Sequence, residues 1–191
     1  NVGLYSIYHS VLNDGRSYAF EPSIFNLKQL ARNIYENNCH NKIAIIPNPL
    51  SSTNKIDSFK YGNIEEGGAL SAFGVEYGFD GNNLEFMFSS KVMGFSLDYL
   101  ISSKLINELP NLVKMDVDGI EPIILEGAVE TLASDNVRTI LIEVNSDFKV
   151  QENKVHQILN DCGFKYRDKY TDGDMSSTSK YKKTGNEVWV K

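Results

Sequence analysis

Four stretches of the chain place apolar residues at the i, i+3, i+4 spacing that lines one face of a helix. These stretches contain Leu4, Ile7, Tyr8 and Val11; Leu27, Leu30, Ala31 and Ile34; Leu125, Val129 and Leu132; and Val155, Ile158, Leu159 and Cys162. Boundary residues support the helices, because Ser23 is a good N-cap for the second and Gly163 stands in the C′ position of the last. The pattern therefore predicts four amphipathic helices.

Apolar runs that are too short for helices separate these stretches and predict strands. They occupy residues 18–20, 42–46, 112–115, 139–142 and 187–190. Strands that alternate with helices favour an α/β fold, and nearly continuous apolar strands are typical of a sheet buried on both faces. We therefore expect a mostly parallel, twisted sheet with helices on both faces.

The regular alternation breaks over residues 55–100. Residues 56–61 and 84–88 have the composition of strands, while residues 62–83 between them are rich in Gly, Asn and acidic side chains. This pattern predicts an inserted hairpin or lid within a single domain that spans residues 1–191. Residues 172–183 are expected to form a polar loop.

Composition narrows the classes of partner. The net charge is −6 and the isoelectric point is near 5.1, so clustered basic side chains for nucleic acid or an anionic membrane are not expected. The two cysteines are far apart and indicate neither a disulfide framework nor a zinc ribbon. No apolar run approaches the roughly 18 residues of a membrane span. These features favour a cytoplasmic protein without membrane insertion, and a homo-oligomer remains open.

Acidic residues stand at the ends of three predicted strands: Glu21, then Asp116 with Asp118, then Glu143. Ligands of open α/β sheets bind outside the carboxyl ends of the strands, so these acids are candidate site residues. Glu21 lies 18 positions after Gly3, a spacing that suits a carboxylate binding the two hydroxyls of a ribose. The alternative is that Glu21 only complements the dipole of the helix that starts at Ser23.

The other candidate residues each have a structural alternative. Glu143 faces Asp116 if both strands are parallel neighbours, and it then orients or deprotonates an acceptor hydroxyl; otherwise it is a solvated strand end. Glu121 precedes Pro122 and fits ordinary helix capping as well as a site role. His156 lies between core positions of a helix, where a surface or boundary histidine is expected. No metal-ligand spacing stands out, so no metal site is predicted.

Several segments together resemble the FkbM family of class I, Rossmann-like methyltransferases that use S-adenosylmethionine. They occur in the family's order: Asn1-Val2-Gly3-Leu4-Tyr5-Ser6, Ala19-Phe20-Glu21-Pro22, Asn48-Pro49-Leu50-Ser51, Ser96-Leu97-Asp98, Val113-Lys114-Met115-Asp116-Val117-Asp118-Gly119-Ile120-Glu121 and Leu141-Ile142-Glu143-Val144. Pro49 stands where the family usually has a small residue. Asp118 replaces the commoner Glu, which keeps the charge and shortens its reach.

The resemblance implies roles for these positions. Asn1 and Gly3 of the methionine loop would bind the methionine half of the cofactor, and Glu21 and Pro22 would bind its ribose. The adenine pocket would consist of Asn48, Leu50 and Ser51. Asp116 would lie near the methyl group. Asp116 and Glu143 would be the catalytic residues. The family's central first strand precedes the loop and is absent from this sequence, so we expect neighbouring strands with unpaired edges.

The implied reaction is O-methylation of a hydroxyl on a glycan sugar or a secondary metabolite, with a small molecule or glycan as the partner. Three alternatives stay open: a methyltransferase acting on RNA or protein, a nucleotide-binding module whose Glu21 contacts the ribose of NAD, and a non-catalytic scaffold. Glu65, Glu66 and Asp80 in the insertion count against RNA.

Overall fold

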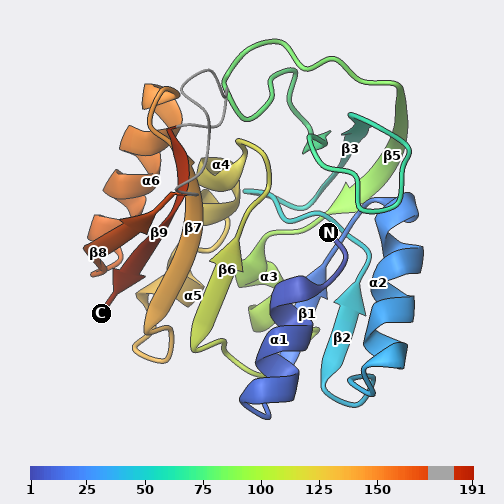
Figure 1. Cartoon of the computed structure of the whole chain (residues 1–191). Helices are drawn as coiled ribbons and strands as arrows, with labels where there is room; N and C mark the ends of the chain where they lie inside the picture. The colour runs from blue at the N-terminus through green and yellow to red at the C-terminus, as the bar shows by residue number, and fades with distance from the viewer. Residues whose placement is uncertain (172–182) are drawn as a thin grey trace.

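The computed structural model of the chain describes residues 1–171 and 183–191, so the expected polar loop lies almost wholly outside the described residues. The helices and strands follow one another along the chain as α1 (Leu4–Leu12), β1 (Ser17–Phe20), α2 (Ile24–Glu36), β2 (Ile43–Ile46), β3 (Lys55–Tyr61), β4 (Ala72–Phe73), β5 (Phe88–Gly94), α3 (Leu97–Ser102), β6 (Leu112–Met115), α4 (Glu121–Glu126), α5 (Val129–Ala133), β7 (Thr139–Asn145), α6 (Lys149–Asp161), β8 (Lys165–Tyr170) and β9 (Thr184–Val190). Figure 1 shows α1 in front of the strands and α3 and α5 behind them. The predicted α/β class is confirmed.

The strands form three sheets of mixed direction. β1 pairs with β2 in parallel, β4, β3 and β5 form an antiparallel sheet, and the third sheet has the order β6-β7-β9-β8. In this third sheet only β6 and β7 are parallel, because β9 runs antiparallel to both β7 and β8. The expected mostly parallel sheet is therefore wrong for this chain.

The hairpin of β8 and β9 is one cause of that error. Residues 165–170 have no apolar alternation, and all except Lys169 are exposed in the structure. A strand with this sequence is stabilised by pairing with β9 rather than by its own burial. Its antiparallel pairing with β9 could not be inferred from local sequence.

β1 and β6 each have a free edge among the described strands, because β1 pairs only with β2 and β6 pairs only with β7. Helix α1 contacts both sheets: it packs on β1 and β2, and the Tyr5 ring lies 5.1 Å from the Lys114 ammonium of β6.

The predicted helices are confirmed with two corrections. Leu4, Tyr8 and Val11 of α1 are 72%, 62% and 56% exposed, so the apolar face of α1 is not buried as expected. The helix expected around Leu125 and Leu132 is broken into α4 and α5. The break follows from a close approach, because a Cβ at Gly127 would lie 2.1 Å from the Ser51 carbonyl oxygen.

The insertion contains the antiparallel sheet β4-β3-β5, but its second long strand lies later than expected. Residues 88–94 pair with β3, in a register that joins Tyr61 to Phe88, whereas residues 84–88 were expected. The register is set by a partner some thirty positions earlier in the chain, so local composition does not determine it. Helix α3, which begins at the N-cap Ser96, was not predicted.

The main core lies between the third sheet and helices α4, α5 and α6. Ile140, Ile142 and Val144 of β7 are fully buried there, together with Leu125 and Leu132. Among the described residues no helix is long and apolar enough to cross a membrane, and a cytoplasmic location stays a prediction.

Two glycines with positive φ provide a matched test of how the insertion packs on this core. Gly119 (φ 109°) and Gly163 (φ 87°) both adopt backbone angles that favour glycine. A Cβ at Gly163 would meet nothing within 4 Å, whereas one at Gly119 would lie 2.8 Å from the Gly78 carbonyl oxygen. We expect Gly163→Ala to lower the free energy of unfolding by about 1–2 kcal/mol, and Gly119→Ala by a further ~1–3 kcal/mol. Urea unfolding measures both, and equal losses would contradict the close contact.

Candidate functional site

The carboxyl end of β1 places Glu21 beside the start of the chain. The Glu21 backbone N–H donates to the Ile46 carbonyl oxygen at 3.1 Å, which continues the pairing of β1 with β2. The buried Glu21 carboxylate accepts from the Ser23 N–H at 2.7 Å and from the Asn26 amide at 3.4 Å. It also pairs with the N-terminal ammonium of Asn1. The structure therefore brings Asn1 and Glu21 together, while Pro22 leads into the N-cap Ser23.

Gly3 supports this arrangement because its backbone turns sharply into α1. Its φ of 92° lies in the left-handed region, and a Cβ there would lie 2.5 Å from Leu30 of α2. A larger residue would push α1 away from α2. Gly3 thus holds the Asn1 loop close to the helix that follows Glu21.

The segment after β2, residues 48–51, makes contacts inside the fold. The Asn48 amide donates to the Met93 carbonyl at 2.9 Å, and Leu50 bridges to Phe95. Ser51 is 1% exposed, and its hydroxyl has no hydrogen-bond partner among the described residues. These contacts tie the segment to β5 and α3, and an adenine role for it stays a prediction.

Asp116 follows β6 and Glu143 lies near the end of β7, and the two carboxyl groups are close enough for their charges to interact. Asp116 is exposed and pairs with the Lys114 ammonium at 2.9 Å, which also donates to Asn186 at 2.6 Å. Glu143 is half-buried, and no hydrogen bond to its carboxyl is seen in the described part of the chain. Burial, followed by the negative charges of Asp116 and Glu121, raises the pKa of Glu143 to about 8.

Asp118 and Glu121 carry two further carboxyl groups near Glu143. Asp118 has a positive φ of 59° and accepts from the Leu70 N–H at 2.8 Å; its pKa is raised, chiefly by burial. Glu121 is fully buried and accepts from the Val117 N–H at 3.1 Å and from the Gln151 amide at 2.6 Å. Burial raises the pKa of Glu121 to about 7. Its hydrogen bonds make Glu121 a supporting residue beneath the site rather than a surface cap.

The insertion connects the Glu21 end of the site to the Asp118 end. Asn26 exchanges hydrogen bonds with the loop, donating to the Gly68 carbonyl at 3.0 Å and accepting from the Gly67 N–H at 2.9 Å. Two positions later, Leu70 is bound by Asp118. Because two residues span at most about 7 Å, the loop contacts of Asn26 and of Asp118 lie close together. We call residues 67–70 the bridging loop.

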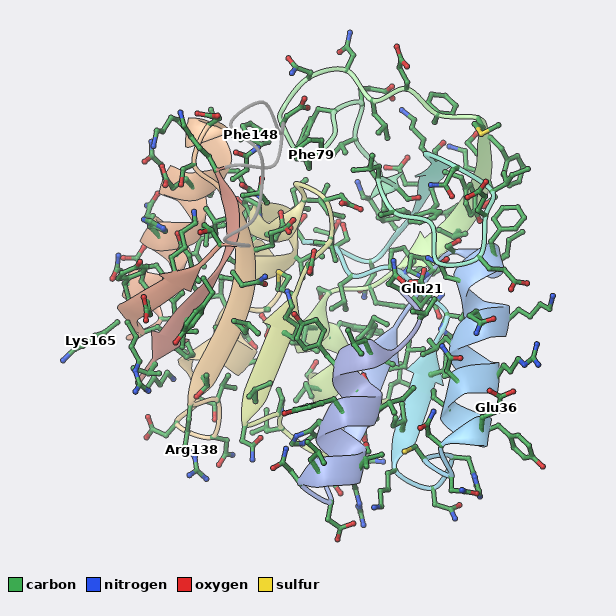
Figure 2. The ribbon with its side chains drawn as sticks, in the orientation of Figure 1. Glu21, Glu36, Phe79, Arg138, Phe148 and Lys165 are labelled. Carbon is green, nitrogen blue, oxygen red and sulfur yellow. The ribbon has the colours of Figure 1, made fainter. Side chains whose placement is uncertain are left out.

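Figure 2 shows Phe79 in the upper part of the view, Glu21 near the middle, and Glu36 and Arg138 below them. The Phe79 carbonyl accepts from the buried Asn145 amide at 3.2 Å, and the Asn145 N–H donates to Gln151 at 2.9 Å. A surface hollow of about 240 Å³ lies instead at the amino ends of β1 and β2, where it is lined by Arg16, Ser17, Tyr18, His40, Asn41, Lys42, Ile43, Ala44 and Glu108.

Asn26, Asn145 and Gln151 are the site-supporting residues that sequence reasoning missed. Each is a buried amide that binds a carboxylate or a backbone group from a distant segment. The available signal was a polar residue at an interior position of a helix or at a strand end, which is costly unless it is hydrogen-bonded.

The sequence model described as "Methyltransferase FkbM domain" matches residues 1–166. The chain belongs to the FkbM methyltransferase family. No curated protein matches it.

A solved structure agrees with this family. The crystal structure of Methyltransferase FkbM from Methylobacillus flagellatus KT superposes with a TM-score of 0.58 at 15% sequence identity, over 97% of this chain and 41% of that one. At this identity the likeness concerns the fold alone. The FkbM chain studied here spans less than half the length of that neighbour.

The crowded carboxyl groups predict how stability depends on pH. Glu143 has a folded pKa of about 8 against an ordinary value of 4.5, so the folded state binds this proton more tightly than the unfolded state does. The contribution of this proton to the free energy of unfolding is fully present below about pH 4.5 and is lost as the pH rises toward about 8. We expect the free energy of unfolding of Glu143→Gln to fall less steeply with pH, so that the variant is more stable than the wild type at pH 8.

Urea unfolding between pH 5 and pH 8 measures the effect, with the exposed Glu130→Gln on α5 as the control. Parallel curves for Glu143→Gln and the wild type would show that the Glu143 pKa is not raised by the fold.

Proposed function

We propose that this FkbM methyltransferase uses S-adenosylmethionine to methylate a hydroxyl group on a sugar or a secondary metabolite. The observation that carries the proposal is Glu143, a half-buried carboxyl with a raised pKa beside Asp116 at the carboxyl ends of β6 and β7. A carboxyl whose pKa is raised to about 8 is a stronger base than an ordinary carboxylate, and its ionised fraction grows as the pH rises toward that value.

The residues present fit a cofactor of this kind at the Glu21 end. A ribose offers two hydroxyl donors, and the Glu21 carboxylate already accepts from the Ser23 N–H and the Asn26 amide. The positive φ of Gly3, 92°, lets the loop of Asn1 turn back beside Glu21 before α1 begins. When bound, S-adenosylmethionine supplies an activated methyl group.

The chain's own residues then have distinct tasks. Glu21 and Asn1 would hold the ribose and the methionine half of the cofactor. Asp116, exposed at the end of β6, would orient the acceptor hydroxyl, and Glu143 would accept its proton. Holding the hydroxyl in line with the donor provides much of the acceleration in a displacement of this type. The bridging loop connects the Glu21 end of the site to the Asp118 end.

Acidic surroundings favour a neutral hydroxyl acceptor over a nucleic acid. Asp116, Asp118, Glu121 and Glu143 lie within electrostatic reach of one another, and Lys114 is already paired with Asp116. A phosphate backbone would meet repulsion at this edge. We therefore assign the acceptor to uncharged sugars or metabolite hydroxyls.

Two conservative variants separate binding from chemistry. Glu21→Gln keeps an oxygen for the Ser23 N–H but loses the charge, and we expect it to weaken S-adenosylmethionine binding about tenfold or more. Glu143→Gln is expected to bind the cofactor normally and to lose about 100-fold or more in turnover. Calorimetric titration measures the first, and release of S-adenosylhomocysteine with a panel of hydroxyl acceptors measures the second.

Glu36→Gln is the control for charge removal, because Glu36 lies at the far end of α2, the helix that follows Glu21, and pairs with Arg32. Full turnover by Glu143→Gln would remove Glu143 from the mechanism. Equal binding by Glu21→Gln and Glu36→Gln would remove Glu21 from the cofactor site, and a wild-type chain that binds no S-adenosylmethionine would support a non-catalytic scaffold.

A further inference from the structure

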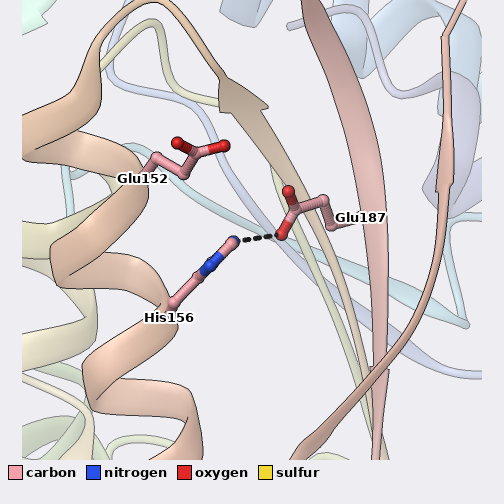
Figure 3. Close-up of side chains that lie close together, drawn as sticks. All are labelled: Glu152, His156 and Glu187. Atoms are coloured by element: carbon pink, nitrogen blue, oxygen red, sulfur yellow. Dashed lines mark hydrogen bonds and ion pairs between the residues drawn. The ribbon is translucent and has the colours of Figure 1, made fainter.

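A second cluster of ligand-type side chains lies where α6 packs on β9. Glu152 and His156 stand four positions apart on α6 and therefore share one face of the helix. Glu187 reaches the same point from β9, and Figure 3 shows all three side chains converging between the helix and the strand. Each offers one ligand atom, and these atoms lie within 4.8 Å of one another.

The distances are close to those of a bound ion. His156 Nε2 lies 2.9 Å from Glu187 Oε2, whereas two ligands of a tetrahedral zinc ion, each at about 2.0 Å, are about 3.3 Å apart. A shift of a few tenths of an ångström therefore opens this pair to an ion. The Glu152 carboxylate, which pairs with the exposed Lys149 ammonium, has to move further than the other two ligands, since the three ligand atoms lie within 4.8 Å of one another.

The donor set selects the kind of cation. One imidazole nitrogen with two carboxylate oxygens suits zinc and similar first-row divalent ions, whereas calcium and magnesium prefer oxygen alone. Three protein ligands leave a fourth position for water. The combination is more specific than a group of acidic residues, because the histidine contributes a borderline-soft nitrogen.

Neighbouring side chains fix the buried ligand. The Trp189 indole N–H donates to Glu187 Oε2 at 3.0 Å, and the Trp189 ring packs 5.1 Å from the His156 ring. Such surrounding hydrogen bonds orient metal ligands. The Lys169 ammonium, held by the Val144 carbonyl at 3.0 Å, lies 3.5 Å from Glu187 Oε1, and its positive charge opposes a bound cation.

Two carboxylates and one imidazole give the three ligands a net negative charge, which favours a divalent cation. The Lys149 side chain is 66% exposed, so it can turn into water when a divalent ion takes its place.

We propose that Glu152, His156 and Glu187 form a binding site for a zinc-class divalent ion that joins α6 to β9. The site lies on the helix-covered face of the third sheet: Glu187 is paired with the buried Ile142, whereas Glu143 is paired with Asn186. Paired residues share a face of the sheet and successive residues alternate. The ion is therefore on the opposite face from Glu143, and its role is structural.

Zinc titration of the metal-stripped protein tests the proposal. Trp189 is the single tryptophan of the chain, so its fluorescence reports directly on the site, and calorimetry gives the stoichiometry. We expect one zinc ion per chain and a rise in the melting temperature with zinc, because a ligand that binds only the folded state stabilises it. Glu152→Gln and His156→Ala should each weaken binding about tenfold or more and lose that rise.

His40→Ala is the matched control, since His40 is exposed and packs near Tyr35, far along the chain from α6. It should bind zinc as the wild type does. If zinc leaves the wild-type melting temperature unchanged, or binds Glu152→Gln and His156→Ala as tightly as the wild type, the cluster is only a hydrogen-bonded packing contact and the proposal is wrong. Glu152→Gln keeps the test valid if His156→Ala does not fold.

Discussion

The alternation of side chains along β7 is the constraint on which the rest of the structure depends. Ile140, Ile142 and Val144 are fully buried against α4, α5 and α6, so Glu143 between them must lie on the opposite face. A slip of one residue would bury Glu143 and expose the apolar set, which strongly specifies the register. The same register places Glu187 on the helix side and Asn186 beside Glu143.

Crowding of carboxyl groups at this edge is a cost that the fold offsets elsewhere. Glu121 and Asp118 are satisfied by the Gln151 amide and the Leu70 N–H, whereas Glu143 has no such donor among the described residues and takes the largest shift toward the protonated form. Structural acids are thus hydrogen-bonded, and the unsatisfied acid is the one suited to exchange a proton with a ligand.

The sequence predicted the helix ends and strands that depend on residues close together in the chain. The Ser23 N-cap, the Gly163 terminus and the strands of residues 112–115 and 139–142 were foreseen because each depends on neighbours in the chain. The β8–β9 hairpin, the register of β5 and the break at Gly127 depend on segments that are distant in sequence. For the same reason the acids at the strand ends were found, but the buried amides and the Glu187 ligand set were not.

The bridging loop contacts Asn26, next to Glu21, and Asp118, next to the Asp116–Glu143 pair, and we propose that S-adenosylmethionine binds along this edge. Hydrogen–deuterium exchange with and without S-adenosylmethionine tests it most directly, because ligand binding slows exchange of the amides that it orders. The account predicts slower exchange in residues 1–3, 21–26 and 67–70, and no change around residues 40–44 at the opposite end of the strands. Slower exchange confined to residues 40–44, or none in the bridging loop, would contradict it.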